Sequence, residues 1–559
     1  MMKVLIVGGV AAGASTAARL RRLDEKAEII IFERGGEVSY SNCGLPYFIG
    51  GVIADPDELL LQTPESLWNR FRIDVRTFSE VTSIDRKSKT VSVRKVTTGE
   101  CYTESYDKLV LAPGAEAILP PIPGADLPGV CTLRTVQDTM RIHELVVLQN
   151  CRHAVVIGGG FIGLEMVENL RNDNVDVTLL QHSAQVFPPF DPEMASIVQK
   201  ELDANHVCVE MNTSVEKIER SDGQYRIHCS QDGREHDILC DLVIVAIGVR
   251  PESRLAASAG LNTNAKGGIP VDKYLQTEDK NIYAGGDVIE VENQISGKKM
   301  QLPMAGPANR QGRIIAANLA GGSETFDGVI GSCVCKVFHQ TAACTGLNEK
   351  TLRAQGIAYE KVYLSPSQHV GVYPGASPMT MKLLFASDGK VLGCQCIGTD
   401  GVEKRVDVVA SVLHFHGTVH DLAALELCYA PPYSSAKDPV NFAGFLAENA
   451  LSGRSPLIHW TDIENRPDDA VLIDVRTPRE YAAGHLKGSV NIPVDEIRQR
   501  LPEIPENRPL WIYCQVGLRG YVAQRMLMQL RPGQKVFNLS GGYRLIKIAG
   551  LIPDQLCRE

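Results

Sequence analysis

The segment Lys3-Val4-Leu5-Ile6-Val7-Gly8-Gly9-Val10-Ala11-Ala12-Gly13 decides the first part of the fold. Its apolar run, residues 3–7, is typical of a parallel strand buried on both faces, and the glycine turn predicts a helix of small residues from Ala14 to about Leu23. A second apolar run, residues 28–32, ends at Glu33, 20 residues after Gly13. This order of strand, glycine turn, helix, strand and acid predicts a dinucleotide site, with the pyrophosphate at the helix N-terminus.

The same pattern returns about 150 residues later. Residues 154–157 lead into Gly158-Gly159-Gly160-Phe161-Ile162-Gly163, a helix is expected through about Asn172, and a strand at 176–180 ends at Gln181, where an acid is expected. The first unit has its own departure, because Val10 replaces the middle glycine of Gly-x-Gly-x-x-Gly. An ordinary strand–helix–strand unit without a nucleotide is the alternative for this first unit, but two such units in one chain favour two bound dinucleotides.

Length and composition narrow the class of protein. A chain of 559 residues predicts three or four domains. The net charge of −9 argues against nucleic-acid binding, and no apolar run approaches the ~20 residues of a membrane span. The N-terminus is interpreted as a buried strand rather than a secretory signal, so a cytoplasmic enzyme is expected. The 15 cysteines, which include the C-x-C pairs Cys333/Cys335 and Cys394/Cys396, are expected to be mostly reduced, and no metal site is predicted.

Three further runs end in glycine or aspartate: 109–114, 242–248 and 281–287. With these motifs the chain resembles the pyridine nucleotide-disulfide oxidoreductase family over about residues 1–450. The resemblance implies an α/β protein with two Rossmann-like dinucleotide-binding domains, an α+β dimerisation domain and, from the remaining sequence, a rhodanese-like α/β domain. The expected limits are 1–149 and 252–330 for FAD, 150–251 for NAD(P)H, 331–450 for dimerisation, 451–458 for a linker and 459–559 for the last domain.

The resemblance also assigns cofactor residues. The expected FAD-binding residues are Gly8, Gly9, Val10, Ala11, Ala12, Gly13, Glu33, Arg34, Ala112, Gly114, Asp287 and Tyr429. The expected NAD(P)H-binding residues are Gly158, Gly160, Phe161, Ile162, Gly163, Gln181 and Gly248. Because Gln181-His182-Ser183 offers no lysine or arginine for a 2′-phosphate, NADH is favoured over NADPH.

Cys43 is the expected redox group. Many disulfide reductases of this family carry C-x-x-x-x-C here, but the partner position is Phe48. A lone thiol closes no internal disulfide, so its oxidised form is a mixed disulfide, a persulfide or a sulfenic acid. This single-cysteine form resembles the coenzyme A-disulfide reductase branch, whose relatives include NADH oxidases and peroxidases.

Ser15, Arg19 and Arg22 share one stripe of the first helix, and two guanidinium groups on one face suit a phosphate. Pattern alone favours a solvated helix face. The resemblance instead implies a coenzyme A site made of Ser15, Arg19, Arg22, Ser39, Asn42, Cys43, Asn309 and Lys437.

The segment 429–438, Tyr-Ala-Pro-Pro-Tyr-Ser-Ser-Ala-Lys-Asp, is the second family feature. The resemblance implies a homodimer in which this segment completes the partner's active site, with Tyr429 and Tyr433 near flavin and cysteine. Tyr373 is a further catalytic candidate. The alternative for these tyrosines is packing beside a rigid Pro-Pro turn.

The C-terminal residues resemble a rhodanese. The carrying motifs are Asp474-Val475-Arg476, Glu480-Tyr481, residues 484–489 and the loop Cys514-Gln515-Val516-Gly517-Leu518-Arg519. Cys514 follows a strand, and consecutive N–H groups in such a loop stabilise a thiolate that becomes a persulfide.

Together these features predict an FAD-dependent NAD(P)H oxidoreductase that reduces coenzyme A persulfide or polysulfide, releasing sulfide, and coenzyme A disulfide through Cys43. Cys514 would supply or accept sulfane sulfur. The alternatives are coenzyme A-disulfide reduction as the main activity, an NADH oxidase or peroxidase that cycles Cys43 through sulfenic acid, and a sulfur-carrier or redox-sensing protein with little turnover.

Overall fold

The structure, a computed structural model, describes residues 1–557. Its contacts divide the chain into two compact units. The first consists of residues 1–184 and 207–329, and the second of residues 185–206 together with the chain from residue 330 onward. No helix among the described residues combines the length and the apolar character that crossing a membrane requires.

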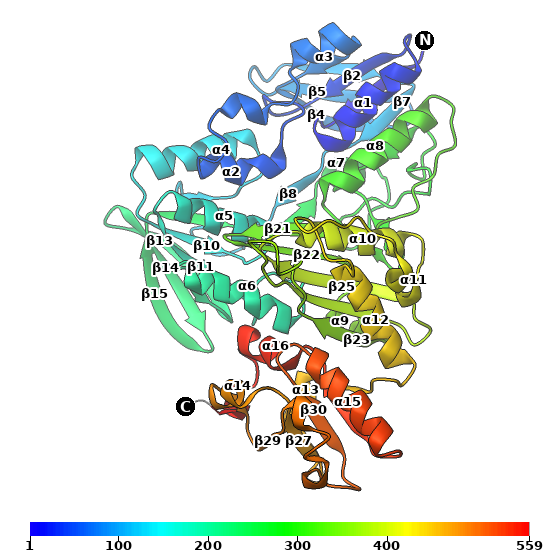
Figure 1. The fold of residues 1–559 in the computed structure, drawn as a ribbon. Helices are drawn as coiled ribbons and strands as arrows, with labels where there is room; N and C mark the ends of the chain where they lie inside the picture. Colours follow the sequence, from blue (N-terminus) through cyan, green and yellow to red (C-terminus); the bar gives the residue numbers. More distant parts are fainter. Residues whose placement is uncertain (558–559) are drawn as a thin grey trace. The chain divides into compact units, whose positions relative to one another are not determined.

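The first unit begins with a parallel five-stranded sheet of order β18-β7-β1-β2-β3 (Figure 1). Its strands are β1 (Lys3–Val7), β2 (Glu28–Phe32), β3 (Asp74–Arg76), β7 (Lys108–Leu111) and β18 (Ile282–Ala284). Helix α1 (Ala11–Leu23) joins β1 to β2 and packs on α8 (Ala305–Leu319). The helix begins three residues earlier than the sequence predicted, because the amide of Ala14 already donates to the carbonyl of Val10 at 2.9 Å.

A second parallel sheet in this unit has the order β12-β11-β10-β16-β9. Its strands are β9 (Val130–Cys131), β10 (His153–Ile157), β11 (Asp176–Leu180), β12 (Cys208–Glu210) and β16 (Leu242–Val245), and α5 (Phe161–Asn172) joins β10 to β11. Antiparallel three-stranded sheets accompany the two parallel ones: β4 (Ser79–Asp85), β5 (Thr90–Lys95) and β6 (Cys101–Ser105), and β13 (Thr213–Ser221), β14 (Gln224–Gln231) and β15 (Arg234–Cys240). The unit therefore contains the two predicted Rossmann-like folds.

Smaller elements complete the first unit. They are β8 (Ala115–Ala117), β17 (Val249–Pro251), β19 (Val291–Glu292), β20 (Lys299–Met300), α2 (Leu45–Ile49), α3 (Pro64–Phe71), α4 (Val136–His143) and α7 (Arg254–Ser258).

The second unit contains an antiparallel five-stranded sheet of order β21-β22-β25-β24-β23. Its strands are β21 (Cys333–Val337), β22 (Gln340–Gly346), β23 (Glu360–Leu364), β24 (Thr380–Phe385) and β25 (Val391–Gly398). The helices of this part are α6 (Pro192–Ala204), α9 (Glu349–Ala354), α10 (Val402–His414), α11 (Val419–Ala424) and α12 (Pro439–Leu451). Both C-x-C pairs lie within strands, as expected.

A parallel sheet of order β26-β31-β30-β27-β29 forms the C-terminal α/β domain. Its strands are β26 (Leu457–Ile458), β27 (Val471–Asp474), β29 (Ser489–Asn491), β30 (Leu510–Tyr513) and β31 (Val536–Leu539), and its helices are α13 (Trp460–Ile463), α14 (Pro478–Ala482), α15 (Leu518–Leu530) and α16 (Gly542–Ala549). A short pair, β28 (His485–Leu486) and β32 (Leu556–Cys557), lies beside them.

Hydrogen bonds from β23 and from α6 join this C-terminal domain to the rest of the second unit. The amide of Tyr363 on β23 donates to Ser540 Oγ at 2.9 Å, and Lys200 Nζ on α6 donates to the carbonyl of Lys547 at 3.0 Å. The C-terminal domain is therefore packed on its unit rather than held by a linker alone.

Candidate active sites

The first glycine turn is held by tight backbone packing. A side chain on Gly8, whose φ is +94°, would lie 2.1 Å from the carbonyl oxygen of Ala112, and one on Gly13 would lie 1.9 Å from that of Gly8. Val10 has φ −102°, a value open to any residue, so its replacement of the middle glycine leaves the turn intact. Glu33 accepts hydrogen bonds from the amides of Gly9 and Gly35, both at 3.0 Å.

A cavity of about 500 Å³ opens beside this turn. It is lined by residues that include Gly8, Phe32, Glu33, Arg34 and Pro113. Its size lies in the range of small-molecule and cofactor sites. These groups fit the nucleotide half of FAD, since the Glu33 carboxylate and the Arg34 guanidinium group line the cavity beside the first residue of the glycine turn, Gly8.

Asp287, the expected ligand of the ribityl chain, forms an ion pair with Arg134 at 2.8 Å. Arg134 also donates from Nε to the carbonyl of Ala115, next to the left-handed Gly114. Sequence reasoning missed Arg134, since no motif marks it.

The second glycine turn repeats the first with one chemical change. Gly158 has φ +107°, and a side chain on Gly163 would meet the Gly158 carbonyl oxygen at 1.9 Å. Gln181 Oε1 accepts from the amide of Gly159 at 2.8 Å, the position at which Glu33 accepts from Gly9. The amide therefore fixes the turn as the carboxylate does, but it brings no negative charge to a bound ribose. A side chain on Gly160 would enter open space, which leaves room for a nucleotide.

The remaining residues that the sequence assigns to NAD(P)H lie in α5 and after β16. Phe161 and Ile162 form the start of α5, and Gly248 follows β16 with φ +122°.

Cys43 lies in a single 3₁₀ turn, Asn42–Gly44, directly before α2, and its side chain is exposed. Phe48, at the missing partner position, is buried and packs on His143 with ring centroids 5.1 Å apart. Partial burial and the negative charge of Glu165 raise the pKa of the Cys43 thiol, Arg134 lowers it, and Asp287 raises it.

Glu165 on α5 is the functional candidate that sequence reasoning missed in this region. Burial raises the pKa of its carboxyl group to about 7, although Tyr47 Oη donates to Glu165 Oε1 at 3.5 Å and opposes the shift. An acid near Cys43 that titrates close to neutral pH is suited to proton transfer. Its signal in the sequence was weak: an acid two residues after Gly163, on a helix that carries a second acid at Glu168.

The predicted coenzyme A residues divide between the two units. Ser15, Arg19 and Arg22 all lie on α1, and Ser15 Oγ donates to Asn309 Oδ1 on α8 at 2.5 Å. Arg19 Nε is buried without a hydrogen-bond partner, which is costly unless a ligand supplies an acceptor. Ser39 adopts φ +52° just before Cys43. Lys437 belongs to the second unit, as does the whole segment 429–438.

That segment is anchored by a buried arginine that the sequence did not reveal. Arg405 on α10 donates to the carbonyls of Gln368 and Tyr433 at 2.7 and 3.3 Å and pairs with Asp438 at 3.1 Å. The loop that carries Tyr373 is thereby fixed beside segment 429–438. Tyr429 and Tyr433 remain 50% and 71% exposed, so their rings are presented outward rather than packed beside the Pro-Pro turn.

The C-terminal cysteine is enclosed by its own loop. Cys514 follows β30, its side chain is fully buried, and its Sγ accepts from the amide of Gly517 at 3.2 Å. Gly517 has φ +101°, a conformation that favours glycine. Arg519 pairs with Glu480 at 2.6 Å. The remaining loop residues, Gln515, Val516 and Leu518, complete the turn into α15.

Comparison with known proteins identifies the family. The model of pyridine nucleotide-disulphide oxidoreductases matches residues 2–312. The chain belongs to the pyridine nucleotide-disulphide oxidoreductase family. The dimerisation domain of the same family matches residues 332–439, and the rhodanese-like domain matches residues 460–549.

Two individual relatives carry names more specific than that of the family. A coenzyme A disulfide reductase of Staphylococcus epidermidis is 34% identical over 450 residues, which cover 80% of this chain and 100% of that one. An NADH oxidase of Methanocaldococcus jannaschii is 36% identical over 452 residues, with 80% and 99% coverage.

Two solved structures extend over almost the whole chain. The reduced CoADR-RHD of Bacillus anthracis is 46% identical, with a TM-score of 0.95 and 99% coverage of both chains. An NAD-dependent persulfide reductase from A. fulgidus is 37% identical, with a TM-score of 0.90 and coverage of 97% and 100%.

These matches confirm the predicted resemblance and fold class. They also confirm that the chain is an oxidoreductase of a family that uses FAD and a nicotinamide nucleotide. The roles of the individual site residues stay predictions, and they enter the proposal below.

Proposed function

We propose that this protein reduces coenzyme A persulfide, releasing sulfide, and coenzyme A disulfide, with Cys43 as the redox group and Cys514 as a sulfane-sulfur carrier. The observation that carries the proposal is the lone, exposed Cys43 with buried Phe48 at the partner position. The second sulfur must then arrive with the substrate. The relatives named as coenzyme A disulfide reductase and persulfide reductase support the substrate class.

The chemistry at Cys43 balances without another protein thiol. The Cys43 thiolate bonds to the coenzyme A sulfur of the persulfide, the S–S bond breaks and hydrosulfide leaves. Two electrons and a proton then release coenzyme A thiol and restore the Cys43 thiolate. FAD, when bound, passes the electrons from NAD(P)H. Glu165, with a pKa of about 7, holds or releases a proton near the thiol at neutral pH.

Recognition of the substrate is assigned to α1 and α8. Arg19, with its unpartnered buried Nε, and the exposed Arg22 would bind phosphate, and the contact between Ser15 and Asn309 would border the same site. In the proposed homodimer, the anchored segment 429–438 brings Tyr429, Tyr433 and Lys437 to the partner's Cys43 site. Its exposed tyrosines support that role. The proposal retains the domain limits that the sequence predicts.

Two further parts of the proposal concern the nicotinamide nucleotide and the cellular compartment. NADH is favoured over NADPH because residues 181–183 carry no lysine or arginine for a 2′-phosphate, although Gln181 also lacks the carboxylate that favours a 2′-hydroxyl. None of the fifteen cysteines, all of which lie in the described residues, forms a disulfide, which suits a reducing cytoplasm.

The test follows NADH consumption and sulfide release with coenzyme A persulfide, coenzyme A disulfide, hydrogen peroxide and air as separate acceptors. The proposal expects sulfide from the persulfide in the wild type and in Cys101→Ser, a matched exposed-cysteine control, and none in Cys43→Ser. Cys514→Ala should abolish sulfur transfer from thiosulfate and spare disulfide reduction. Sulfide release that persists in Cys43→Ser would refute the assignment.

One alternative has its own support. The NADH oxidase relative favours oxygen or peroxide as acceptor. Faster NADH consumption with air or peroxide than with either coenzyme A substrate would select it.

A further inference from the structure

Two cysteines outside the sites above face each other across the edge of the antiparallel sheet. Cys333 on β21 is the direct cross-strand neighbour of Cys344 on β22, and their Sγ atoms are 3.2 Å apart. Both thiols are free. Directly opposed residues of antiparallel strands have Cα atoms ~4.5 or ~5.5 Å apart, and both values lie in the range that a disulfide spans.

The pairing distinguishes these two from the other cysteines of the sheet. In the described part of the chain, Cys335 lies opposite Ala342, Cys394 lies between Thr345 and Leu383, and Cys396 lies between Ala343 and Met381. None of these three has a cysteine as its cross-strand neighbour. The C-x-C spacing seen in the sequence is therefore incidental, and the partner of Cys333 comes from the next strand.

The two thiols differ in access and in acidity. Cys333 is partly exposed, whereas Cys344 is buried. The hydrogen bond between them lowers the pKa of Cys333, and the same bond together with burial raises the pKa of Cys344. The asymmetry suits an attacking thiol on the outside and a resolving thiol beneath it.

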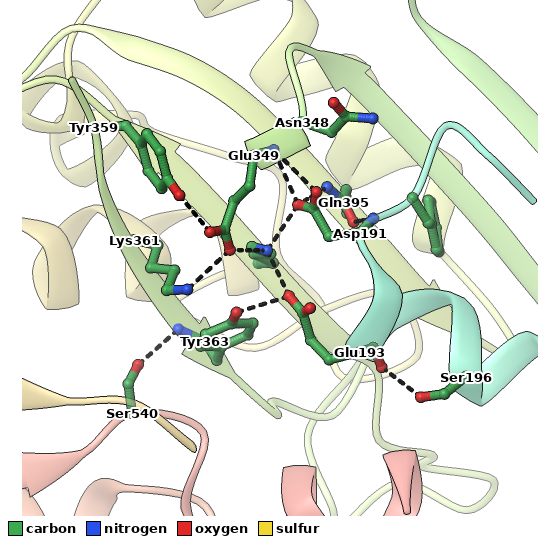
Figure 2. A network of polar contacts seen from close by, with 12 residues as sticks. Asp191, Glu193, Ser196, Asn348, Glu349, Tyr359, Lys361, Tyr363, Gln395 and Ser540 are labelled. Carbon is green, nitrogen blue, oxygen red and sulfur yellow. Dashed lines mark hydrogen bonds and ion pairs between the residues drawn. The ribbon is translucent and has the colours of Figure 1, made fainter. Parts of the chain in front are cut away.

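A buried polar row holds Cys344 in place. Gln395, Lys382 and Tyr363 occupy the successive opposite positions on β25, β24 and β23, so they share the face of the sheet that carries Cys344. Asp191, labelled beside Gln395 in Figure 2, accepts from Gln395 Nε2 at 2.6 Å. It also accepts from Lys382 Nζ at 2.7 Å. This network fixes the strands on the buried side of the thiol pair.

We propose that Cys333 and Cys344 form a second thiol–disulfide site, which low-molecular-weight disulfides oxidise. The Cys333 thiolate bonds to one sulfur of the disulfide, whose S–S bond breaks and releases one thiol. Cys344 then loses its proton and bonds to Cys333 Sγ, and the second thiol leaves. Two protein thiols are oxidised, one disulfide is reduced, and two small thiols are formed.

The test uses the full-length Cys43→Ser protein, without NADH, so that turnover at Cys43 plays no part in the outcome. It is treated with 2-hydroxyethyl disulfide, alkylated, digested with trypsin and examined by mass spectrometry. Cleavage after Arg313, Lys336 and Lys350 places the two cysteines on separate peptides, 314–336 and 337–350. The proposal expects these peptides to be cross-linked, with the link at Cys333 rather than Cys335 on fragmentation.

Variants fix the order of the steps. Cys344→Ala should accumulate a hydroxyethylthio adduct on Cys333, Cys333→Ser should leave Cys344 unmodified, and Cys335→Ser should cross-link as before. The proposal is overturned if no cross-link forms while exposed Cys101 is fully modified. It is equally overturned if Cys344 takes the adduct in Cys333→Ser.

Discussion

Replacement of Lys382 by methionine should destabilise the second unit strongly and in a pH-dependent way. The ammonium group is fully buried and contacts three carboxylates, Asp191 at 2.7 Å and Glu193 and Glu349 at 2.5 Å each. Figure 2 labels these three acids. Methionine fills a similar volume but supplies no charge. The variant therefore leaves the buried carboxylates without the positive charge of Lys382, which balances part of their negative charge.

The structure gives the magnitude by two routes. Breaking a buried ion pair by removing one partner costs about 3–5 kcal/mol. Burial opposes ionisation of Glu349, but Lys382 and Lys361 outweigh it and lower the pKa of that carboxyl from 4.5 to about 2, which corresponds to about 3 kcal/mol. Because Lys361 still pairs with Glu349 at 2.9 Å in the variant, we expect a loss of about 3 kcal/mol at pH 7.

The direction in which stability changes with pH follows from the pKa of Glu349. In the wild type the lowered pKa of Glu349 stabilises the fold above about pH 4.5, and this stabilisation is lost as the pH falls towards 2. In the variant, buried carboxylates without their cation take up protons more readily in the folded state. The difference in stability between variant and wild type should therefore shrink as the pH falls from 7 to 5.

Hydrogen exchange of peptides from β24 and β25, measured on the full chain, reports the opening free energy of this sheet. Lys390→Met is the matched control, since Lys390 is largely exposed in the turn between the same strands and should change stability by less than about 0.5 kcal/mol. Equal exchange in Lys382→Met and Lys390→Met at pH 7 would refute the reasoning, as would a deficit that grows at pH 5.

Three other substitutions test the sites. Because ionised Glu165 raises the pKa of Cys43, Glu165→Gln should speed alkylation of Cys43 by iodoacetamide at pH 8. An unchanged rate would show that the charge of Glu165 does not affect the Cys43 thiol. Gln181→Glu keeps the acceptor for Gly159 and adds a negative charge, so the ratio of kcat/KM for NADH over NADPH should rise about tenfold; an unchanged ratio would show that residue 181 does not face the ribose. Gly517→Ala forces a side chain into φ +101°, at a cost of about 1–3 kcal/mol, and should lower thiosulfate sulfurtransferase activity at least tenfold while NADH-dependent disulfide reduction continues.

The glycine turns and their strands were predictable because their signal is local. The runs at residues 3–7, 28–32 and 176–180 are the strands β1, β2 and β11 without correction. The three runs that end in glycine or aspartate, 109–114, 242–248 and 281–287, extend past their strands, because β7 stops at Leu111, β16 at Val245 and β18 at Ala284. In each case the run continues into the loop at the carboxyl end of the sheet, where the predicted site residues lie.

The missed residues act through tertiary contacts that no spacing encodes. Arg134 meets Asp287 from 153 positions away in the chain, and Arg405 anchors a segment 28 to 33 residues further on. Arginines of this kind carry no motif, since their partners are carbonyls and carboxylates from distant parts of the chain. The pairing of Cys333 with Cys344 likewise depends on strand register, which only the folded sheet defines.

The hydrogen bonds from Tyr363 to Ser540 and from Lys200 to Lys547 have a consequence for sulfur traffic. Ser540 lies three residues before Tyr543, whose amide donates to the carbonyl of Cys514 at 2.8 Å, so the cysteine loop is built on the docked side of its domain. A domain attached in this way is docked on its unit and does not swing on its linker. Under the proposed function, sulfane sulfur bound to Cys514 would therefore leave this domain on a small molecule that diffuses, rather than by movement of the domain on its linker.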